Sequence, residues 1–249
     1  MQGNGVKESL KAYAKLLKLP TFSEVEAGRL RPGESIEEFV LELMKREYDS
    51  RQEKSKEARI KRVRFPVVKT LEEFDLSRLE HIRPEYVKQL AGCEFVKRHE
   101  NIVMIGNPGT GKTHLMTALG LRACVLGYRV MFRTAASLAT ELLEARDNYQ
   151  LRRIEKAIAG ADLLLVDELS YASFRREESE LLFRVIAERS ERASTVITTN
   201  LEFSRWTELF ESEGMVAALV DRLTYRSAIL NMNGESYRLR SSRQKRKSA

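Results

Sequence analysis

The sequence contains few of the residues that anchor disulfides or metal ions. It has two cysteines, Cys93 and Cys124, without C-x-x-C spacing, and three scattered histidines. Free thiols in a reducing compartment are therefore expected rather than a disulfide framework. No apolar run reaches the roughly 18 residues that a membrane span requires, and the first residues, MQGNGVKESLKAY, lack a secretory apolar stretch. These absences predict a cytoplasmic protein.

The positive charge of the chain is concentrated at its two ends. The 249 residues include 43 Lys and Arg against 36 Asp and Glu, a formal net charge of +7. Residues 1–64 carry a net +4 and residues 238–249 a net +6, whereas residues 65–237 carry −3. Basic ends fit a polyanionic partner, and nucleic acid is the first candidate. The alternative is a solvated helix at one end and a flexible tail at the other.

Residues 1–65 are expected to form a small all-helical N-terminal domain. Apolar residues at helical spacing in residues 6–17 predict the first helix. Capping-box patterns predict where the second and third begin: Thr21 with Glu24, and Ser35 with Glu38. The third helix continues to about residue 64 as its apolar stripe fades into a basic surface, so it needs water or a partner on most sides.

Residues 66–237 alternate between short apolar runs and helical patterns. This alternation predicts an α/β fold with a mostly parallel sheet between layers of helices. Strands are expected at residues 101–105, 129–133, 162–167, 194–199 and 228–232. Helices are expected near residues 112–126, 136–148, 150–159, 177–191 and 214–224. The last dozen residues, 238–249, are expected to form a basic C-terminal tail.

The segment Gly106–Thr113 reads GNPGTGKT, a complete G-x-x-x-x-G-K-T motif. It follows the apolar run NIVMI and opens a predicted helix, the context in which this loop binds phosphates. Its glycines allow backbone N–H groups to surround an anion, and the helix N-terminus adds partial positive charge. Lys112 is expected to reach the β- and γ-phosphates of ATP, and the Thr113 hydroxyl to hold Mg²⁺. The expected ATP-binding residues are Gly106, Asn107, Pro108, Gly109, Thr110, Gly111, Lys112, Thr113 and His114.

Two carboxylates and an amide follow apolar strands on the same expected sheet edge. The run DLLLVDE ends in Asp167 and Glu168, placing them beside the phosphates in an open α/β sheet. Asp167 is expected to bind Mg²⁺, and Glu168 to orient and polarise the attacking water. Asn200 ends the run STVITT and is expected to position that water. The alternatives are acidic residues that cap a turn and an ordinary strand-ending Asn.

Arginines late in the chain are candidates for stabilising transition-state charge. Arg222 or Arg226 is expected to reach the ATP of a neighbouring subunit, as an arginine finger does. The alternative is an ordinary ion pair of Arg222 with Asp221 or Glu213. Arg238 is a weaker candidate for contacting phosphate within its own subunit.

These motifs occur in a chain that resembles the IstB-type ATPases, the transposition helper proteins of bacterial insertion sequences. The resemblance covers nearly the whole sequence, including KLLKLPTF, ESIEEFVLELMKREYDSRQ, TLEEFDLSRL, ENIVMIGNPGTGKTHL and GESYRLRSSR. The helical segments and TLEEFDLS are its most specific parts, since many ATPases share the middle motifs. The next relatives are the DnaC-type helicase loaders and DnaA-type initiators of the AAA+ superfamily.

The resemblance implies an AAA+ fold whose ATP sites form between subunits. It assigns Lys112 and Thr113 to Walker A, and Asp167 and Glu168 to Walker B. It assigns Asn200 to sensor 1 and Arg238 to sensor 2. The arginine finger is assigned to Arg222 rather than Arg226. It further implies homo-oligomers on duplex DNA and recruitment or stimulation of a partner transposase. The expected function is therefore that of a DNA-dependent ATPase that assembles on duplex DNA with ATP and remodels or selects the target DNA. Because 27 residues follow Arg222 in this sequence, no sizeable C-terminal helical lid is expected.

Basic residues near the domain ends are the expected DNA contacts: Lys61, Arg62, Arg64, Arg243, Lys245 and Arg246. Contacts to phosphates are independent of base sequence and sensitive to salt, and they would place the protein on the nucleoid when it is bound.

Two other functions remain open. One is a helicase loader that binds a replicative helicase and single-stranded DNA, and the other is a P-loop nucleotide kinase. The kinase leaves the basic ends and the water-directed Glu168 unexplained.

Overall fold

The computed structural model describes residues 3–24, 35–79, 81–171, 174–210, 212–234 and 236–237. The chain forms two compact units, Met1–Ala58 and Arg59–Ala249. The division lies inside a long helix, whereas the sequence placed the boundary after residue 65. The reason is that the end of this helix belongs to the second unit. Ile60 and Val63 pack in its core, and Arg59 Nε donates a 2.9 Å hydrogen bond to the Cys124 carbonyl.

The N-terminal unit is helical, as the sequence predicted, with α1 (Gly3–Leu16), α2 (Pro20–Ser23) and the start of α3 (Ile36–Val63). The capping box before α3 is confirmed. The Ser35 N–H donates to Glu38 Oε2 at 2.9 Å, and the Glu38 N–H donates to Ser35 Oγ at 3.2 Å. Two otherwise unpaired donors at the helix start are therefore satisfied.

The other predicted capping box is wrong. Helix α2 begins at Pro20, whose fixed φ suits a first helical position, so Thr21 lies inside the helix. The Thr21 hydroxyl donates instead to Glu47 Oε2 at 2.6 Å. This hydrogen bond is the main reason that the pKa of Glu47 is lowered. A contact between residues distant in sequence thus replaces the local one.

The second unit is built on a five-stranded parallel sheet, which confirms the predicted fold class. Its strands are β1 (Asn101–Ile105), β2 (Val130–Thr134), β3 (Leu163–Asp167), β4 (Ser194–Thr199) and β5 (Ser227–Asn231). They are ordered β2-β3-β4-β1-β5. Strand β4 therefore lies between β1 and β3, and the carboxyl ends of these three strands meet at one edge of the sheet.

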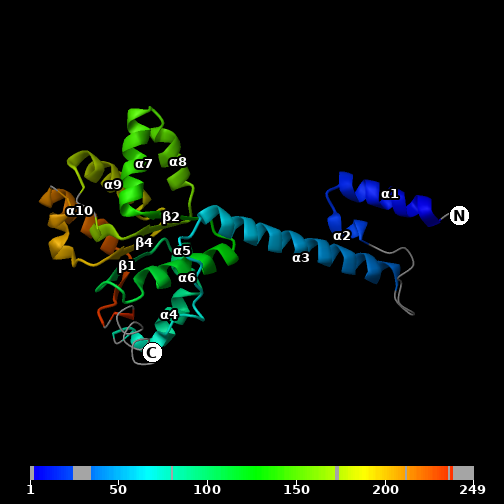
Figure 1. Cartoon of the computed structure of the whole chain (residues 1–249), viewed down its shortest axis with the longest axis horizontal. Coiled ribbons are helices and arrows are strands. Elements are labelled where there is room, and N and C mark those ends of the chain that lie inside the picture. Colours follow the sequence, from blue (N-terminus) through cyan, green and yellow to red (C-terminus); the bar gives the residue numbers. More distant parts are fainter. Residues whose placement is uncertain are drawn as a thin grey trace, which may run out of the picture. The chain divides into compact units, whose positions relative to one another are not determined.

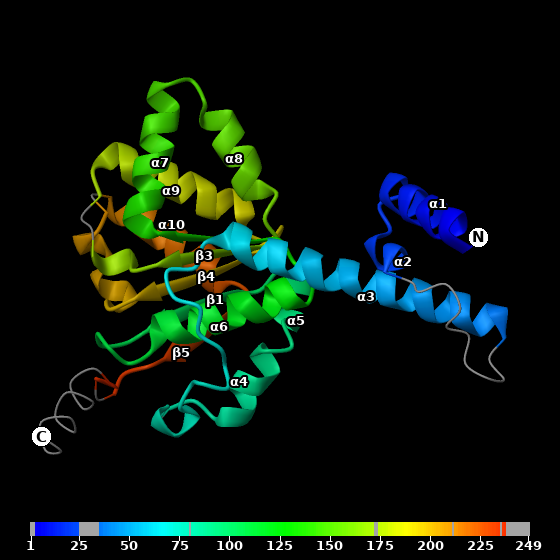
Figure 2. The same ribbon diagram turned by 45° about the vertical axis from the view of Figure 1, so that its right-hand side comes forward.

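Helices cover both faces of this sheet (Figures 1 and 2). One face carries α4 (Pro84–Leu90), α5 (Glu94–Lys97) and α6 (Lys112–Val125), and the other α7 (Ala135–Asp147), α8 (Leu151–Ala159), α9 (Arg176–Arg189) and α10 (Glu213–Thr224). Short 3₁₀ turns are η1 (Leu76–Arg78), η2 (Leu169–Tyr171) and η3 (Phe203–Glu208). The sequence predicted α6 to α10 but not α4 and α5.

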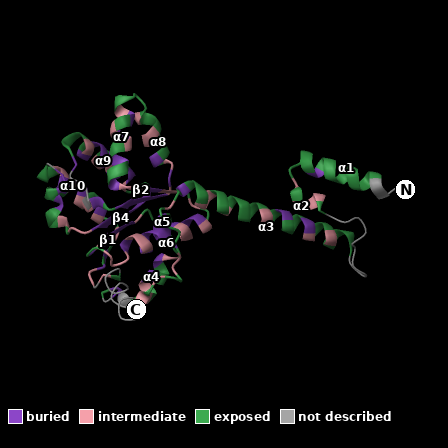
Figure 3. Cartoon of the chain, viewed as in Figure 1, coloured by how far each residue is buried: buried purple, intermediate pink, exposed green. Residues whose placement is uncertain are grey.

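Two hydrophobic clusters fill the space between the sheet and its helices. Side chains alternate across a strand, so Leu163 and Leu165 belong to one cluster while Leu164 and Val166 belong to the other. The apolar run of β3 is buried throughout, as expected for a central parallel strand. Strands β1 and β4 are also largely buried (Figure 3). Within the part of the chain that the structure describes, no helix has the length and apolarity of a membrane span.

Candidate functional site

The loop at residues 106–111 joins β1 to α6, and its glycines are required by its surroundings. A Cβ at Gly106 would lie 2.5 Å from the carbonyl carbon and oxygen of Met232. Gly109 and Gly111 have φ values of +83° and +94°, which side chains rarely adopt. The loop therefore follows a path available only to this pattern of glycines, and the N–H groups of the first turn of α6 are left without acceptors inside the helix.

Residues that follow β5 hold one side of the loop. Asn233 Oδ1 accepts a 3.1 Å hydrogen bond from the Asn107 N–H, and the Tyr237 N–H donates a 3.0 Å hydrogen bond to the Gly109 carbonyl. The loop is thereby connected to the last residues before the basic tail. Sequence reasoning did not identify Asn233, because its contact depends on the pairing of β5 with β1.

The segment before α4 also packs against the loop. A Cβ at Gly111 would lie 2.9 Å from Cε2 of the Phe74 ring. The His114 ring packs edge-on against Phe74, with centroids 5.0 Å apart, and its Nε2 is 2.9 Å from the Thr70 carbonyl oxygen. The imidazole of His114 is thus engaged by the TLEEF segment. Thr70 and Phe74 belong to the stretch that the sequence marked as specific, although no role was assigned to them.

Lys112 extends back across the loop that it terminates. Its ammonium group donates to the carbonyl oxygens of Gly106 at 2.6 Å and Asn107 at 2.8 Å, and the residue is 8% exposed. Burial lowers the pKa of Lys112 to about 8, although the charges of Asp167 and Glu168 act in the opposite direction. A phosphate would offer this buried ammonium group a stronger acceptor than the two carbonyls.

Asp167 receives two hydroxyl groups at the end of β3. Thr113 Oγ1 donates to Asp167 Oδ1 at 3.0 Å, and Thr198 Oγ1 donates to the same oxygen. The carboxylate is 3% exposed and opposes the first turn of α6. Hard cations such as Mg²⁺ take oxygen ligands and often use only one or two from the protein, so this pair fits such an ion. In the described residues no cluster of three or more His, Cys, Asp or Glu forms a metal site.

Glu168 and Asn200 lie at the neighbouring ends of β3 and β4. The Glu168 side chain is exposed and its φ is +60°, which costs a non-glycine residue roughly 1 kcal/mol. Its N–H donates to Thr198 Oγ1 at 2.9 Å, and the Asn200 N–H donates to Ser170 Oγ at 2.8 Å. Sequence reasoning missed Thr198 and Ser170. The available signal was the position of Thr198 two residues before Asn200, in a strand that the sequence predicted.

The two candidate finger arginines are exposed on and after α10. The Arg222 guanidinium lies 5.1 Å from the centroid of the Phe183 ring, and the Arg226 guanidinium lies 5.7 Å from that of Tyr225. Such cation–π contacts are compatible with a group that remains available at the surface. Of the expected DNA contacts, Lys61, Arg62 and Arg64 are exposed at the end of α3 and just after it. Arg238, Arg243, Lys245 and Arg246 lie outside the described residues.

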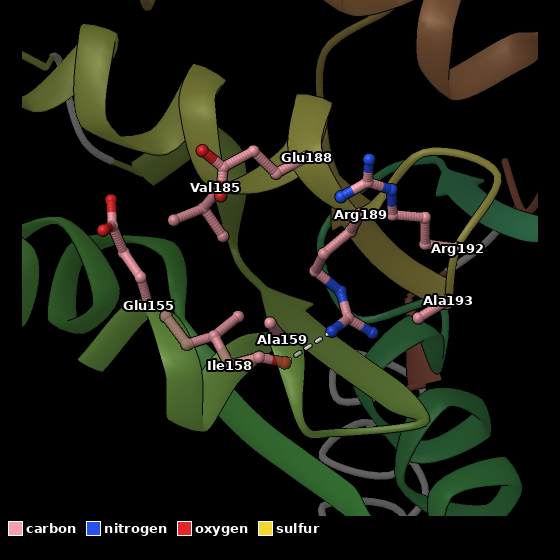
Figure 4. A pocket seen from close by; sticks show the side chains of 8 residues that line it. All are labelled: Glu155, Ile158, Ala159, Val185, Glu188, Arg189, Arg192 and Ala193. Carbon is pink, nitrogen blue, oxygen red and sulfur yellow. Dashed lines mark hydrogen bonds between the residues drawn. The ribbon is translucent and has the colours of Figure 1, made fainter. Parts of the chain in front are cut away.

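A cavity of about 90 Å³ lies beside Arg189, at the amino ends of β3 and β4 and therefore opposite the loop edge (Figure 4). The guanidinium is buried and donates to the carbonyls of Ile158 at 2.6 Å, Ala161 at 3.0 Å and Ser194 at 2.8 Å. Burial lowers its pKa to about 10. Because these backbone acceptors engage the charged group, we assign it a structural role.

The strand order, the glycine loop and the Thr113–Asp167 pair define a P-loop nucleotide-binding protein with the AAA+ fold. Residues 15–245 match the family described as "IstB-like ATP binding protein". The chain belongs to this family, and the resemblance noted from its sequence is confirmed.

Curated relatives carry related descriptions. The chain is 40% identical to "Insertion sequence IS21 putative ATP-binding protein" of Pseudomonas aeruginosa over 206 residues, which cover 83% of this chain and 78% of the relative. It is 32% identical to "Insertion sequence IS5376 putative ATP-binding protein" of Geobacillus stearothermophilus, with 96% of each chain covered. The similarity therefore spans the N-terminal helices as well as the nucleotide-binding unit.

Solved structures of the same fold include DnaA from Aquifex aeolicus bound to AMPPCP. That structure has a TM-score of 0.57 and 22% identity, covering 74% of this chain and 56% of the DnaA chain. The structure of DnaI has a TM-score of 0.55 and 16% identity, covering 66% of this chain and 90% of DnaI. At these identities the likeness concerns the fold alone.

Proposed function

We propose that this protein is a DNA-dependent ATPase that assembles on duplex DNA and recruits or stimulates a transposase. The observation that carries the proposal is the convergence of Lys112, Thr113 and Asp167 at one sheet edge in a chain of the IstB-like family. The descriptions of the relatives as insertion-sequence ATP-binding proteins support the transposition context. They favour it over the helicase-loader alternative.

The residues at the sheet edge divide the work of hydrolysis. The loop N–H groups and Lys112 bind the phosphates, and Thr113 with Asp167 would hold Mg²⁺, which supplies charge neutralisation on the phosphate oxygens. Glu168 accepts a proton from water as the water oxygen attacks the γ-phosphorus, and Asn200 orients that water. The bond between the γ-phosphorus and the bridging oxygen breaks, so the products are ADP and inorganic phosphate.

The ATP site is completed by a neighbouring copy of the chain. Arg222 is exposed on α10, where its guanidinium is held over Phe183 without burial. A cation supplied to the γ-phosphate of the adjacent subunit would stabilise the charge of the transition state. We assign this role to Arg222 rather than Arg226 because of its place in the Asp-Arg-Leu sequence. Arg238 is proposed to contact phosphate within its own subunit.

DNA binding is assigned to the basic ends of the chain. Lys61, Arg62 and Arg64 present exposed charge, and the tail adds Arg243, Lys245 and Arg246. The N-terminal helical unit, Met1–Ala58, is proposed to contact DNA, the transposase or neighbouring subunits. Its support is a set of exposed apolar side chains on α1 and α3, including Tyr13 and Leu16. The protein would act in the cytoplasm, on the nucleoid when bound to DNA.

The function is tested by measuring ATP turnover and particle mass with duplex or single-stranded DNA, in ATP, ADP or no nucleotide. Large particles that form on duplex DNA with ATP support the proposal. Preference for single strands contradicts it and favours the helicase loader.

Lys112→Ala should abolish nucleotide binding, whereas Glu168→Gln should bind ATP and hydrolyse it poorly. Arg222→Ala should keep ATP binding and lose hydrolysis. Wild-type ATPase activity of the protein as an isolated monomer would exclude an arginine finger supplied by a neighbouring subunit.

A further inference from the structure

The Thr198 hydroxyl contacts both acidic residues at the end of β3. Thr198 is 1% exposed, and its Oγ1 donates to Asp167 Oδ1 while accepting the Glu168 N–H at 2.9 Å. A hydroxyl group can do both at once, because it carries one proton and two lone pairs. One side chain of β4 therefore fixes the carboxylate that ends β3 and the backbone of the residue that follows this strand.

These hydrogen bonds begin where the pairing of the two strands stops. The β3–β4 register runs from Leu163 opposite Ser194 to Val166 opposite Ile197. Beyond this pairing, side chains join the two strand ends. Thr198 of β4 contacts Asp167 and Glu168 at the end of β3. In return, Ser170 Oγ, which follows β3, accepts the Asn200 N–H, which follows β4, at 2.8 Å. The proposed catalytic residues thus lie on a stretch whose geometry depends on two hydroxyl groups.

Glu168 needs such support because its backbone is unfavourable. Its φ of +60° lies in the left-handed region, where a non-glycine residue persists only if its surroundings hold it. The hydrogen bond from its N–H to Thr198 is an interaction that can do so. The direction in which the Glu168 carboxylate leaves the strand then depends on Thr198.

The other contact concerns the orientation of Asp167. Thr113 and Thr198 donate to the same oxygen, Oδ1. If the Thr113 hydroxyl turns toward a metal ion, it no longer fixes the carboxylate from the α6 side. Thr198 approaches from β4 and can keep its hydrogen bond, so the carboxylate retains its rotamer while it binds the ion.

We propose that Thr198 is a positioning residue for ATP hydrolysis, orienting Asp167 toward the metal ion and Glu168 toward the attacking water. The inference rests on the proposed ATPase function and adds a residue to its machinery. Thr198 acts through the two acidic residues that its hydroxyl contacts. Its loss should therefore reduce turnover and metal-dependent binding more than metal-free nucleotide binding.

The test compares Thr198→Val, which keeps the shape and removes the hydroxyl, with Thr198→Ser, which keeps the hydroxyl. We expect Thr198→Val to lower kcat at least tenfold while binding of a fluorescent ADP analogue without Mg²⁺ changes less than about twofold. The Mg²⁺ concentration that half-saturates the metal-dependent part of binding should rise severalfold. Thr198→Ser should restore most of both properties.

Thr195→Val is the matched control, because Thr195 is buried in the same strand and its hydroxyl contacts Arg189 at the far edge. It should leave kcat and Mg²⁺ dependence unchanged. If Thr198→Val does not fold, Thr198→Ala is measured in its place. Wild-type kcat and Mg²⁺ dependence in these variants, or equal losses in Thr195→Val, would overturn the inference. An inactive wild-type protein would instead contradict the ATPase function, and the Mg²⁺ titration would still test the orientation of Asp167.

Discussion

Single residues at the nucleotide loop are constrained by neighbours from distant parts of the chain. Gly106 is the clearest case, because its missing side chain leaves room for the backbone at Met232. The pKa of Lys112 also depends on its surroundings. Its ammonium group is buried against two loop carbonyls, and this burial lowers its pKa to about 8. The loop residues are therefore adapted to one tertiary setting as well as to phosphate.

Gly106→Ala should destabilise the second unit by roughly 2 kcal/mol and weaken nucleotide binding at least tenfold, because its Cβ would collide with backbone atoms. The unfolding free energy and the affinity for an ATP analogue measure these effects. Gly214→Ala is the control, since nothing lies within 4 Å of its added Cβ at an exposed position in α10. Its stability should be unchanged or slightly higher, and an equal loss in both variants would refute the steric explanation.

The two thiols should be unreactive in the folded protein. Cys93 and Cys124 are buried, and this burial raises the pKa of each to about 11 from 9.0. Because the folded state retains these protons longer, their stabilising contribution is present below pH 9 and is lost as pH rises through 11. Iodoacetamide at pH 8 should modify neither thiol before unfolding and both after it. Rapid alkylation of native protein would contradict the buried positions.

At the scale of elements, the sequence predicted the positions of the strands better than it predicted the starts of the helices. The five strands occur within one residue of their predicted starts. The central strands are either apolar runs, as in β1 and β3, or rich in β-branched residues, as in β4. The Thr21 capping box failed because α2 begins at Pro20, so Thr21 lies inside the helix rather than before it. Helices α4 and α5 were missed, since short helices carry little periodic signal and are stabilised by packing on the core.

Arg189 should stabilise the second unit by joining α8, α9 and β4. Arg189→Leu would remove the Arg189 donor from the carbonyls of Ala161 and Ser194, and one of the two donors from the carbonyl of Ile158, at a cost of roughly 3 kcal/mol. Denaturant unfolding measures the loss. Arg192→Ala at the exposed rim of the same cavity is the control, with an expected change within about 0.5 kcal/mol. Loss of nucleotide affinity without loss of stability in Arg189→Leu would show that the cavity is not purely structural.

For the whole molecule, the distribution of charge has a consequence for DNA binding. The basic ends flank a central region of net negative charge, so phosphate contacts are expected to concentrate at the ends. The proposed assembly on DNA would bring several such ends onto one duplex. Binding should therefore depend strongly on salt and weakly on base sequence.

Neutralising the tail at Arg243, Lys245 and Arg246 with Gln should weaken duplex binding similarly for unrelated sequences. The slope of log affinity against log salt should decrease in magnitude by roughly 0.9 per lost phosphate contact. The charge-matched control substitutes Lys97, Arg98 and Arg205, each ion-paired with a neighbouring glutamate. Fluorescence anisotropy across salt concentrations measures the slopes, and equal slopes in the two triple variants would exclude a specific role for the tail.

The sequence by itself determined the features that depend on neighbouring residues. The loop needs its glycines for their backbone freedom, the strands need their apolar runs for burial, and Asp167 ends β3 with Glu168 directly after it. The family could also be identified at this level, because TLEEFDLS and the helical segments accompany the common nucleotide motifs. Local order along the chain was enough for these conclusions.

Only the tertiary structure decided which side chains meet around those features. Thr198 reaches Asp167 because β4 lies beside β3, Phe74 packs at Gly111, and Asn233 binds the loop after β5 has paired with β1. It also decided that the end of α3 packs with the nucleotide-binding unit rather than with the helices that precede it. The physical reason is that hydrogen bonds and side-chain packing act over a few ångströms in space, whereas these partners are separated by many residues in sequence.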